Sequence, residues 1–294
     1  MYKKKAAITL FITLAVVVAM LSLVGIVFTY LADARSRAVD KAALIQANVL
    51  FADARDALDT FVGKNPSVGR LKNIYDVPVM LKEKKGRFNM LIACLPAHAA
   101  IPITWFKEGA ENQARYNLAS LVLEDIVLKH EIKDAALLSD LISKAVSQEY
   151  TTEFGKLGRV KRDLNYFSYN SFKKVLNDYI LQTDDMSVYK VNWNLFYSFG
   201  EDFKELDGDF LSAKLISIIF GIDEQIVKED FKSGELKNFL IENGGDIELY
   251  NSTLFAKKPV VAMKCSANYK YGDRSYSFSF KYIDKKVSDF EFSW

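Results

Sequence analysis

Histidine and cysteine are scarce in this chain, with 2 of each among 294 residues. A structural zinc site draws about four ligands from these two residue types, so the count nearly excludes one. Gly-rich phosphate loops and the motifs GxSxG and HExxH are also missing. His98 follows a proline turn, His130 is predicted near the end of a helix, and neither has a nucleophile pattern beside it. The sequence therefore predicts a protein that is not an enzyme.

An excess of charge of either sign is lacking as well. The 39 basic and 37 acidic residues leave a net charge of +2, whereas nucleic-acid binding usually needs a basic surface. Helices predicted over 210–220 and 223–231, with Gly221 between them, are spaced like a helix-hairpin-helix DNA reader. The balanced charge argues against that function, so we expect no nucleic-acid partner. At 50% hydrophobic and 26% charged residues, the chain is neither disordered nor collagen-like.

The sequence does contain one long apolar run. Residues 6–31, AAITLFITLAVVVAMLSLVGIVFTYL, carry no charge and would form about 39 Å of helix, enough to cross a hydrocarbon core of ~30 Å. The run is longer than the apolar core of a secretory signal and does not end in a small-x-small cleavage site. We expect a membrane-spanning helix over 7–31, behind a short basic leader over 1–6.

The orientation of this span rests on a narrow charge difference. Three lysines at 3–5 precede it, and Arg35, Arg37 and Lys41 follow it. The count of Lys and Arg is a tie, which the free amino terminus tips towards a cytoplasmic N-terminus. The body of the protein would then lie on the other side of the membrane.

The helix is predicted to continue beyond the membrane. Residues 32–62 contain no Gly or Pro, and Gly63 and Pro66 provide a stop. One helix from about 7 to 62 would be on the order of 80 Å long, and its second part, 32–62, is amphipathic. The predicted apolar stripe of that part comprises Val39, Ala43, Leu50, Ala54, Ala57 and Phe61.

Small residues on the apolar half suggest where another helix could pack. They are Ala15, Ala19, Ser22, Gly25 and Thr29. Small side chains let two helix backbones approach closely in a membrane, and we therefore predict a helix-packing face here. The milder interpretation is a simple anchor followed by a juxtamembrane stalk.

The rest of the chain predicts an α+β fold. Alternating residues over 261–269 and 276–282 flank a Gly-Asp turn at 271–274, which is the pattern of an antiparallel hairpin. Its aromatic face would cover the amphipathic helix. Another strand is predicted over 87–95, an extended segment over 186–196 and a loop over 149–161. The predicted helices cover 113–130, 135–146, 169–181, 210–220, 223–231 and 236–242.

These elements give a domain scheme. A long N-terminal membrane-spanning helix would pack on a C-terminal antiparallel sheet, with a large α-helical insertion between the strands. The first strand region is expected at 63–111 and the C-terminal strands at 247–294. The helical insertion is expected at 112–246, in two small subdomains at about 112–185 and 200–246.

Four segments in this order are similar to the pilin superfamily. They are KKKAAITLFITLAVVVAML, GRFNM, ELDGDFLSAKLISIIFGIDEQIVKEDF and MKCSANYKYGDRSYSFSFKY. Within that superfamily the chain resembles the general secretion pathway protein K family, the largest minor pseudopilin of type II secretion. The resemblance implies a non-enzymatic subunit at the tip of a pseudopilus. It also implies an anchor in the bacterial inner membrane and a body in the periplasm.

The resemblance also implies processing and partners. Prepilin peptidase would cut after Ala6 and release a mature chain beginning at Ala7. Pilin leaders usually end in Gly, so Ala6 departs from the pattern. Phe11 stands where most pilins carry a Glu, an absence expected of the resembled family. The implied partners are other minor pseudopilins, inner-membrane secretion components and membrane lipid.

Two smaller features stay open at this level. Cys94 and Cys265 fall in predicted strands of one sheet, and an oxidising periplasm would allow them to pair, but two buried free thiols are the commoner arrangement. Glu205, Asp207 and Asp209 are calcium candidates, because members of the resembled family bind calcium through acidic side chains. Capping of a helix by Asp209 is the favoured interpretation, and no cofactor is expected.

A different class of function remains as the alternative. The chain would then be a single-pass, membrane-anchored binding or sensory adaptor with an extracytoplasmic domain. Only five residues precede the span, so that reading lacks a cytoplasmic output domain.

Overall fold

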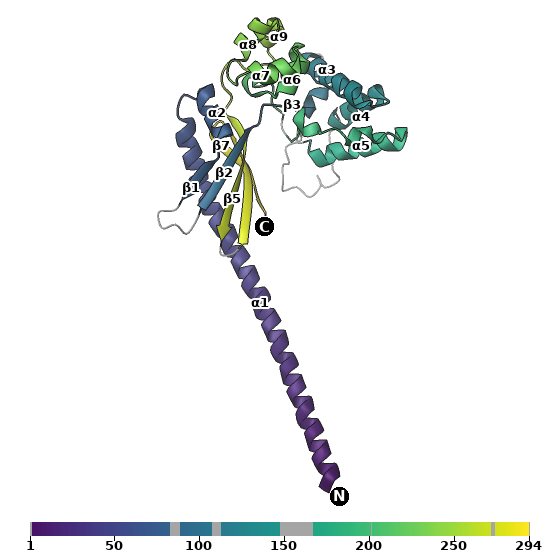
Figure 1. Ribbon diagram of the computed structural model, residues 1–294, viewed down its shortest axis with the longest axis vertical. Coiled ribbons are helices and arrows are strands. Elements are labelled where there is room, and N and C mark those ends of the chain that lie inside the picture. Colours follow the sequence, from purple (N-terminus) through teal and green to yellow (C-terminus); the bar gives the residue numbers. More distant parts are fainter. Residues whose placement is uncertain are drawn as a thin grey trace, which may run out of the picture.

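The computed structural model describes residues 2–82, 89–107, 113–147, 167–200, 202–271 and 274–293, with side chains in the first helix from Thr13 onward. A long helix forms a stalk, an antiparallel sheet packs along its C-terminal half, and a helical lobe covers the end of the sheet farthest from the N-terminus (Figure 1). This arrangement confirms the predicted fold class.

The stalk helix α1 runs without interruption over Tyr2–Val62, as predicted. It ends where Gly63 takes a positive φ of 70°, and the Gly63 N–H donates to the carbonyl of Asp59 at 3.1 Å. Ser67 then caps the short helix α2, Val68–Asp76, by accepting from the Arg70 N–H.

The face of α1 that packs on the sheet differs in part from the predicted stripe. The prediction of Phe61 as a core residue is wrong, since its side chain is 51% exposed. The buried positions advance mostly by four residues, which exceeds one helical turn, so the contact line rotates around the helix as it follows the twisted sheet. They are Ala43, Ala47, Leu50, Ala54, Leu58 and Val62.

The sheet is antiparallel and has the strand order β1-β2-β5-β6-β7. Its strands are β1 Val79–Lys82, β2 Asn89–Pro96, β5 Ala262–Tyr271, β6 Arg274–Ile283 and β7 Lys286–Ser293. The predicted hairpin is confirmed, because β5 pairs with β6 from Ala262↔Ile283 to Tyr271↔Arg274. Its turn at 272–273 lies outside the described residues. Alternate residues of β2, β5 and β6 are buried against α1.

The helical lobe is inserted between β2 and β5, which are neighbours in the sheet. Its core is a cluster separate from the core between sheet and α1. This core includes Ile101, Phe106 and Phe255, so the lobe extends on both sides of residues 112–246. Its elements are β3 Ile101–Pro102, η1 Ile103–Phe106, α3 Gln113–His130, α4 Ala135–Ser147, α5 Tyr169–Thr183, η4 Met186–Tyr189, η5 Trp193–Leu195, β4 Tyr197–Ser198, η6 Gly208–Phe210, α6 Ala213–Phe220, α7 Glu224–Asp230, α8 Leu236–Asn243 and α9 Ile247–Tyr250.

The predicted helices are confirmed, with one shifted start. Helix α6 begins at Ala213 instead of residue 210, because Ser212 caps it by accepting from the Leu215 N–H. The predicted loop over 149–161 lies outside the described residues.

The prediction of an extended segment over 186–196 is wrong. Asp185 accepts from the Ser187 N–H and starts the turn η4, and the Trp193 indole donates to the carbonyl of Val188 at 2.8 Å. Buried positions 188, 191, 193 and 196 are spaced by two or three residues, so the segment folds as successive turns.

Candidate assembly surface

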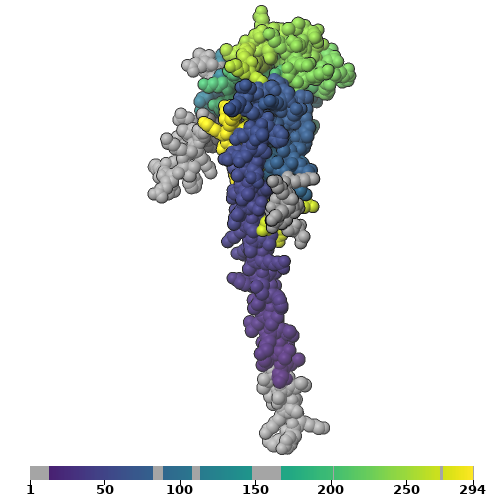
Figure 2. Space-filling model, turned by 90° about the vertical axis from the view of Figure 1, so that its left-hand side faces the viewer, coloured from purple at the N-terminus to yellow at the C-terminus, as the bar shows by residue number. Residues whose placement is uncertain are grey.

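The N-terminal, apolar half of α1 is an uncovered surface along its described residues. Among the described residues, α1 is the one helix long and apolar enough to cross a membrane, and none of its apolar window is buried. Leu14, Leu21, Leu23, Ile26 and Phe28 are each between 62% and 67% exposed. Figure 2 shows this half as a bare stalk below the head of the molecule. A surface of this size and composition needs lipid or other helices around it.

The predicted helix-packing residues lie within this bare surface. These five residues, Ala15, Ala19, Ser22, Gly25 and Thr29, are all exposed. The Ser22 hydroxyl donates to the Val18 carbonyl at 2.9 Å and the Thr29 hydroxyl to the Ile26 carbonyl at 2.7 Å. These hydroxyls are therefore satisfied within the helix and add little polar cost to an apolar contact. Their role in helix packing remains a prediction.

Just beyond the apolar half of α1, polar contacts fix the sheet onto the helix. The Arg274 guanidinium forms an ion pair with Asp40 at 2.8 Å and donates to the Ser36 hydroxyl at 3.0 Å. The Tyr276 hydroxyl donates to the same Asp40 carboxylate at 2.9 Å. The Tyr269 hydroxyl donates to the Ala43 carbonyl at 2.5 Å. The tip of the β5–β6 hairpin is thereby held against α1.

Further up the helix the contact is aromatic. Phe51 projects from α1 into a cluster with Phe278, Phe280 and Phe290, at ring-centre distances of 5.0–6.3 Å. Tyr282 donates its hydroxyl to Asp59. Burial raises the pKa of the Tyr269 hydroxyl to about 12, and burial together with the Asp59 charge raises that of Tyr282. Both tyrosines therefore remain protonated and donate to α1. These hydrogen bonds fix the position of β5 and β6 along the helix.

The two cysteines form a disulfide, which corrects the preference for free thiols. Cys94 of β2 lies directly opposite Cys265 of β5, with the two Cα atoms 4.0 Å apart. Both side chains are 2% exposed. Sequence reasoning placed both cysteines in one sheet, but it could not fix the register that sets them face to face. The bridge ties together the two strands between which the helical lobe is inserted.

Two of the three calcium candidates, Asp207 and Asp209, accept hydrogen bonds from the lobe's own backbone. Glu205 is exposed, whereas Asp207 is 6% exposed and accepts from the Asp209 and Val260 N–H groups at 3.2 and 3.3 Å. Asp209 accepts from the Leu236 N–H at 3.3 Å. No group of three or more potential metal ligands occurs in the part of the chain that the structure describes, and calcium binding by these residues stays a prediction. Asp209 does cap a helix, but that helix is α8. It is not α6, which follows Asp209 in the sequence.

The junction between the sheet and the helical lobe holds two titratable groups, of which Asp207 is buried and His98 is half-buried. His98 stacks on Phe203 with ring centres 3.8 Å apart, and its carbonyl accepts from the Asp207 N–H at 3.0 Å. Burial lowers the pKa of His98 to about 4 and raises the pKa of Asp207 to about 6. Neither side chain has a nucleophile beside it, and the arrangement supports a structural role at the junction.

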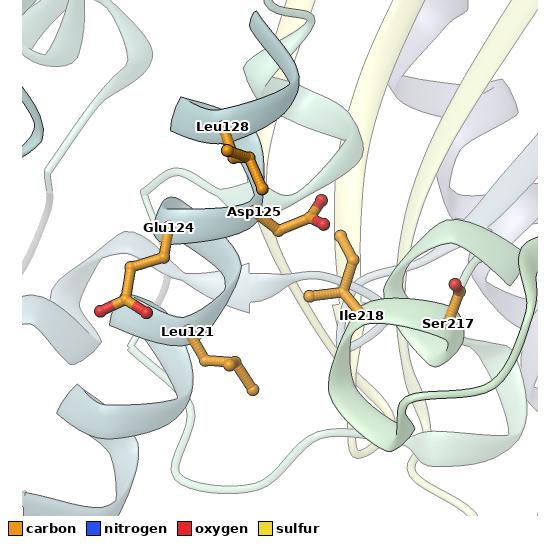
Figure 3. Close-up of a pocket in the computed structure, with 6 residues that line it drawn as sticks. All are labelled: Leu121, Glu124, Asp125, Leu128, Ser217 and Ile218. Carbon is orange, nitrogen blue, oxygen red and sulfur yellow. The ribbon is translucent and has the colours of Figure 1, made fainter. Parts of the chain in front are cut away.

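Hollows on the helical lobe are shallow. One of about 330 Å³ lies between α3 and α6, and Figure 3 shows Asp125 and Ile218 pointing into it while Glu124 points away from α6. A second of about 630 Å³ lies beside α3 and shares Leu121 and Glu124 with the first. Both are open, and neither gathers the convergent polar groups of a small-molecule site. The most prominent functional surface is therefore the bare half of α1.

No known family model matches the sequence, and no curated protein is significantly similar to it. A solved structure does share the fold. It is a chain in the crystal structure of the GspK-GspI-GspJ complex from the type 2 secretion system of enterotoxigenic Escherichia coli. The alignment covers 88% of this chain and 99% of that chain, with 10% identity and a TM-score of 0.55. The chain thus has the fold of a GspK-like minor pseudopilin, as the sequence resemblance implied.

Proposed function

We propose that this protein is a minor pseudopilin at the tip of a type II secretion pseudopilus. It would be anchored by α1 in the inner membrane, with its N-terminus in the cytoplasm and its head in the periplasm. Its work would be assembly with other minor pseudopilins and with inner-membrane secretion components. Prepilin peptidase would first cleave between Ala6 and Ala7.

The observation that carries this proposal is the division of α1 into two halves. The first half is apolar and uncovered, and the second half is packed on the sheet. A protein that only holds a domain at a membrane needs a membrane-spanning helix, but that helix need not continue rigidly into the domain. A helix that is locked to the head by Arg274, Tyr276 and Tyr282 transmits a force applied at the apolar half directly to the head.

The position of the helical lobe supports a place at the tip. The lobe lies at the end of the sheet opposite the stalk (Figure 1). In a filament whose core consists of parallel stalk helices, the next subunit would have to pass over that end. A bulky lobe there would obstruct such a subunit, and the chain would therefore terminate the filament instead of extending it.

The mature N-terminus provides the test. Mass spectrometry of the protein from membranes of its native cell should find a chain that begins at Ala7. Recovery of a chain that begins at Met1, from cells with an active prepilin peptidase, would refute the processing. A second test uses the small-residue face: Ala19→Cys should cross-link to a minor pseudopilin. The control Val24→Cys, at least about 100° around the helix from each of the five small residues, should cross-link less. Equal cross-linking at both positions would contradict packing through the predicted face.

A further inference from the structure

A ring of basic side chains surrounds α1 where it leaves its apolar half. Arg35, Arg37 and Lys41 lie on the helix, and Lys270 and Arg274 lie at the tip of the β5–β6 hairpin. We call these five residues the basic collar. Among the described residues at the same level, these five cations stand against two acidic residues, Asp33 and Asp40. The bias of Lys and Arg towards the cytoplasmic side of a membrane makes such a ring on the opposite side unexpected.

The hairpin tip is held at the level of the ring. Arg274 contacts both Ser36 and Asp40 of α1. At 1.5 Å rise per residue these positions lie roughly 8 and 14 Å beyond Leu31, the last residue of the apolar run. Arg35 lies about 6 Å beyond it. The headgroup layer outside the hydrocarbon core is about 5–8 Å thick, and long basic side chains extend several ångströms towards it.

The collar is only partly neutralised within the protein. Arg37 forms an ion pair with Asp33 at 2.9 Å, and Arg274 forms one with Asp40 at 2.8 Å. Arg35, Lys41 and Lys270 are exposed and form no ion pair with any residue that the structure describes. Because Arg35 and Lys41 lie on different sides of α1 and Lys270 on the sheet, the unpaired cations point outwards around the stalk.

We propose that the basic collar binds the phosphates of anionic phospholipids in the leaflet next to the head. This inference rests on the proposed membrane anchorage of α1. The hairpin tip would thereby rest on the headgroup layer, and the head would stand upright on the membrane before it joins an assembly. The occupant is the anionic headgroup of a bilayer lipid, because the collar lies at the headgroup layer and just above it, within reach of long basic side chains, and surrounds the proposed membrane span.

The test measures which lipids contact the full-length protein. The protein is reconstituted in phosphatidylcholine vesicles that contain traces of spin-labelled phosphatidylglycerol or spin-labelled phosphatidylcholine. Electron paramagnetic resonance then gives the relative association of the two lipids with the protein. Each basic residue near the surface is worth about 1 kcal/mol, so we expect preference for the anionic lipid of up to roughly fivefold for each cation that a headgroup reaches. Raising NaCl to 0.5 M should reduce it.

Two variants separate the collar from other charges. Arg35→Gln, Lys41→Gln and Lys270→Gln in one chain should lower the preference clearly, while the part due to the lysines at 3–5 remains. The control Lys232→Gln with Lys237→Gln, near and on α8 at the far end of the molecule (Figure 1), should keep it. The lysines at 3–5 are common to all three proteins. A triple variant with unchanged preference would overturn the proposal.

A flotation step distinguishes this inference from the proposed function. If the wild-type protein floats with pure phosphatidylcholine vesicles but shows no preference for the anionic lipid, the collar proposal fails and the anchorage stands. If the protein does not float with vesicles at all, the anchorage fails, and the collar proposal fails with it.

Discussion

The half-buried His98 and the buried Asp207 are expected to change the free energy of unfolding in opposite directions as the pH falls. Burial holds the pKa of Asp207 at about 6, above its ordinary value of 3.8. Its contribution to the free energy of unfolding is therefore fully present below about pH 4 and is lost as the pH rises through 6. Burial holds the pKa of His98 at about 4, below its ordinary value of 6.5. Its contribution is present above pH 6.5 and is lost as the pH falls towards 4.

The two contributions are of similar size. Each pKa differs from its ordinary value by roughly 2 units, and one unit corresponds to 1.36 kcal/mol. Between pH 7 and pH 4, Asp207 adds about 2 kcal/mol to the free energy of unfolding, and His98 removes about 3 kcal/mol. The two contributions to the free energy of unfolding therefore nearly cancel in the wild-type protein. Substitution of one residue at a time should reveal the contribution of the other.

Substitution at either position should change the pH dependence in opposite directions. Relative to wild type, the free energy of unfolding of His98→Gln should rise by about 3 kcal/mol between pH 7 and pH 4, because the loss due to His98 is gone. That of Asp207→Asn should fall by about 2 kcal/mol over the same range. Urea unfolding of the full chain in detergent micelles measures both quantities. Trp105 is a suitable reporter, since its indole donates to the carbonyl of Phe203, the residue stacked on His98.

Only the change with pH is compared, so a constant loss of stability in a variant does not affect the result. Other groups titrate in all three proteins and cancel in the comparison, because they are shared. If both variants show the same pH dependence as wild type, the burial argument for this junction is refuted. If both shift in the same direction, the assignment of opposite signs is refuted.

Three further predictions concern stability. Replacing Cys94 and Cys265 by Ala should lower the free energy of unfolding by up to about 5 kcal/mol, because the disulfide closes a loop with a sequence separation of 171 residues. Reduction of the wild-type protein before urea unfolding should have a similar effect. Tyr282→Phe should cost about 1–3 kcal/mol, because the hydrogen bond to Asp59 at the helix–sheet interface is lost; an equal loss on replacing the exposed Tyr30 by Phe would contradict this reason. Lys285→Gly should raise the free energy of unfolding by about 1 kcal/mol, since position 285 adopts a φ of 65° that glycine takes without strain. An unchanged urea midpoint would contradict the argument from backbone strain.

Local patterns were sufficient to predict much of the fold. The helix α1 followed from an uncharged run and from the absence of Gly and Pro over residues 32–62, before Gly63. The β5–β6 hairpin followed from strict alternation on both sides of a Gly-Asp turn. The short helices α7 and α8 were predicted because helix capping depends on residues only a few positions apart. Interactions of such short range can be predicted from the order of neighbouring residues alone.

Contacts between distant residues could not be predicted in this way. Asp209 caps α8 from 27 positions away, and no local signal distinguishes it from a cap of its own helix. Asp207 was grouped with Glu205 as a metal candidate, whereas folding buries one carboxylate and leaves the other in solvent. The spacing of acidic residues cannot show which of them the chain will bury.

The sequence by itself determined that this protein has an apolar helix with an amphipathic continuation, an aromatic hairpin and a set of capped short helices. Only the tertiary structure decided that Cys94 meets Cys265, which face of α1 the sheet covers, and that Arg274 joins the hairpin tip to the base of the head. These features depend on strand register and on the crossing of a helix over a twisted sheet. Both are set by the packing of the whole core, because no short segment carries enough contacts to fix them.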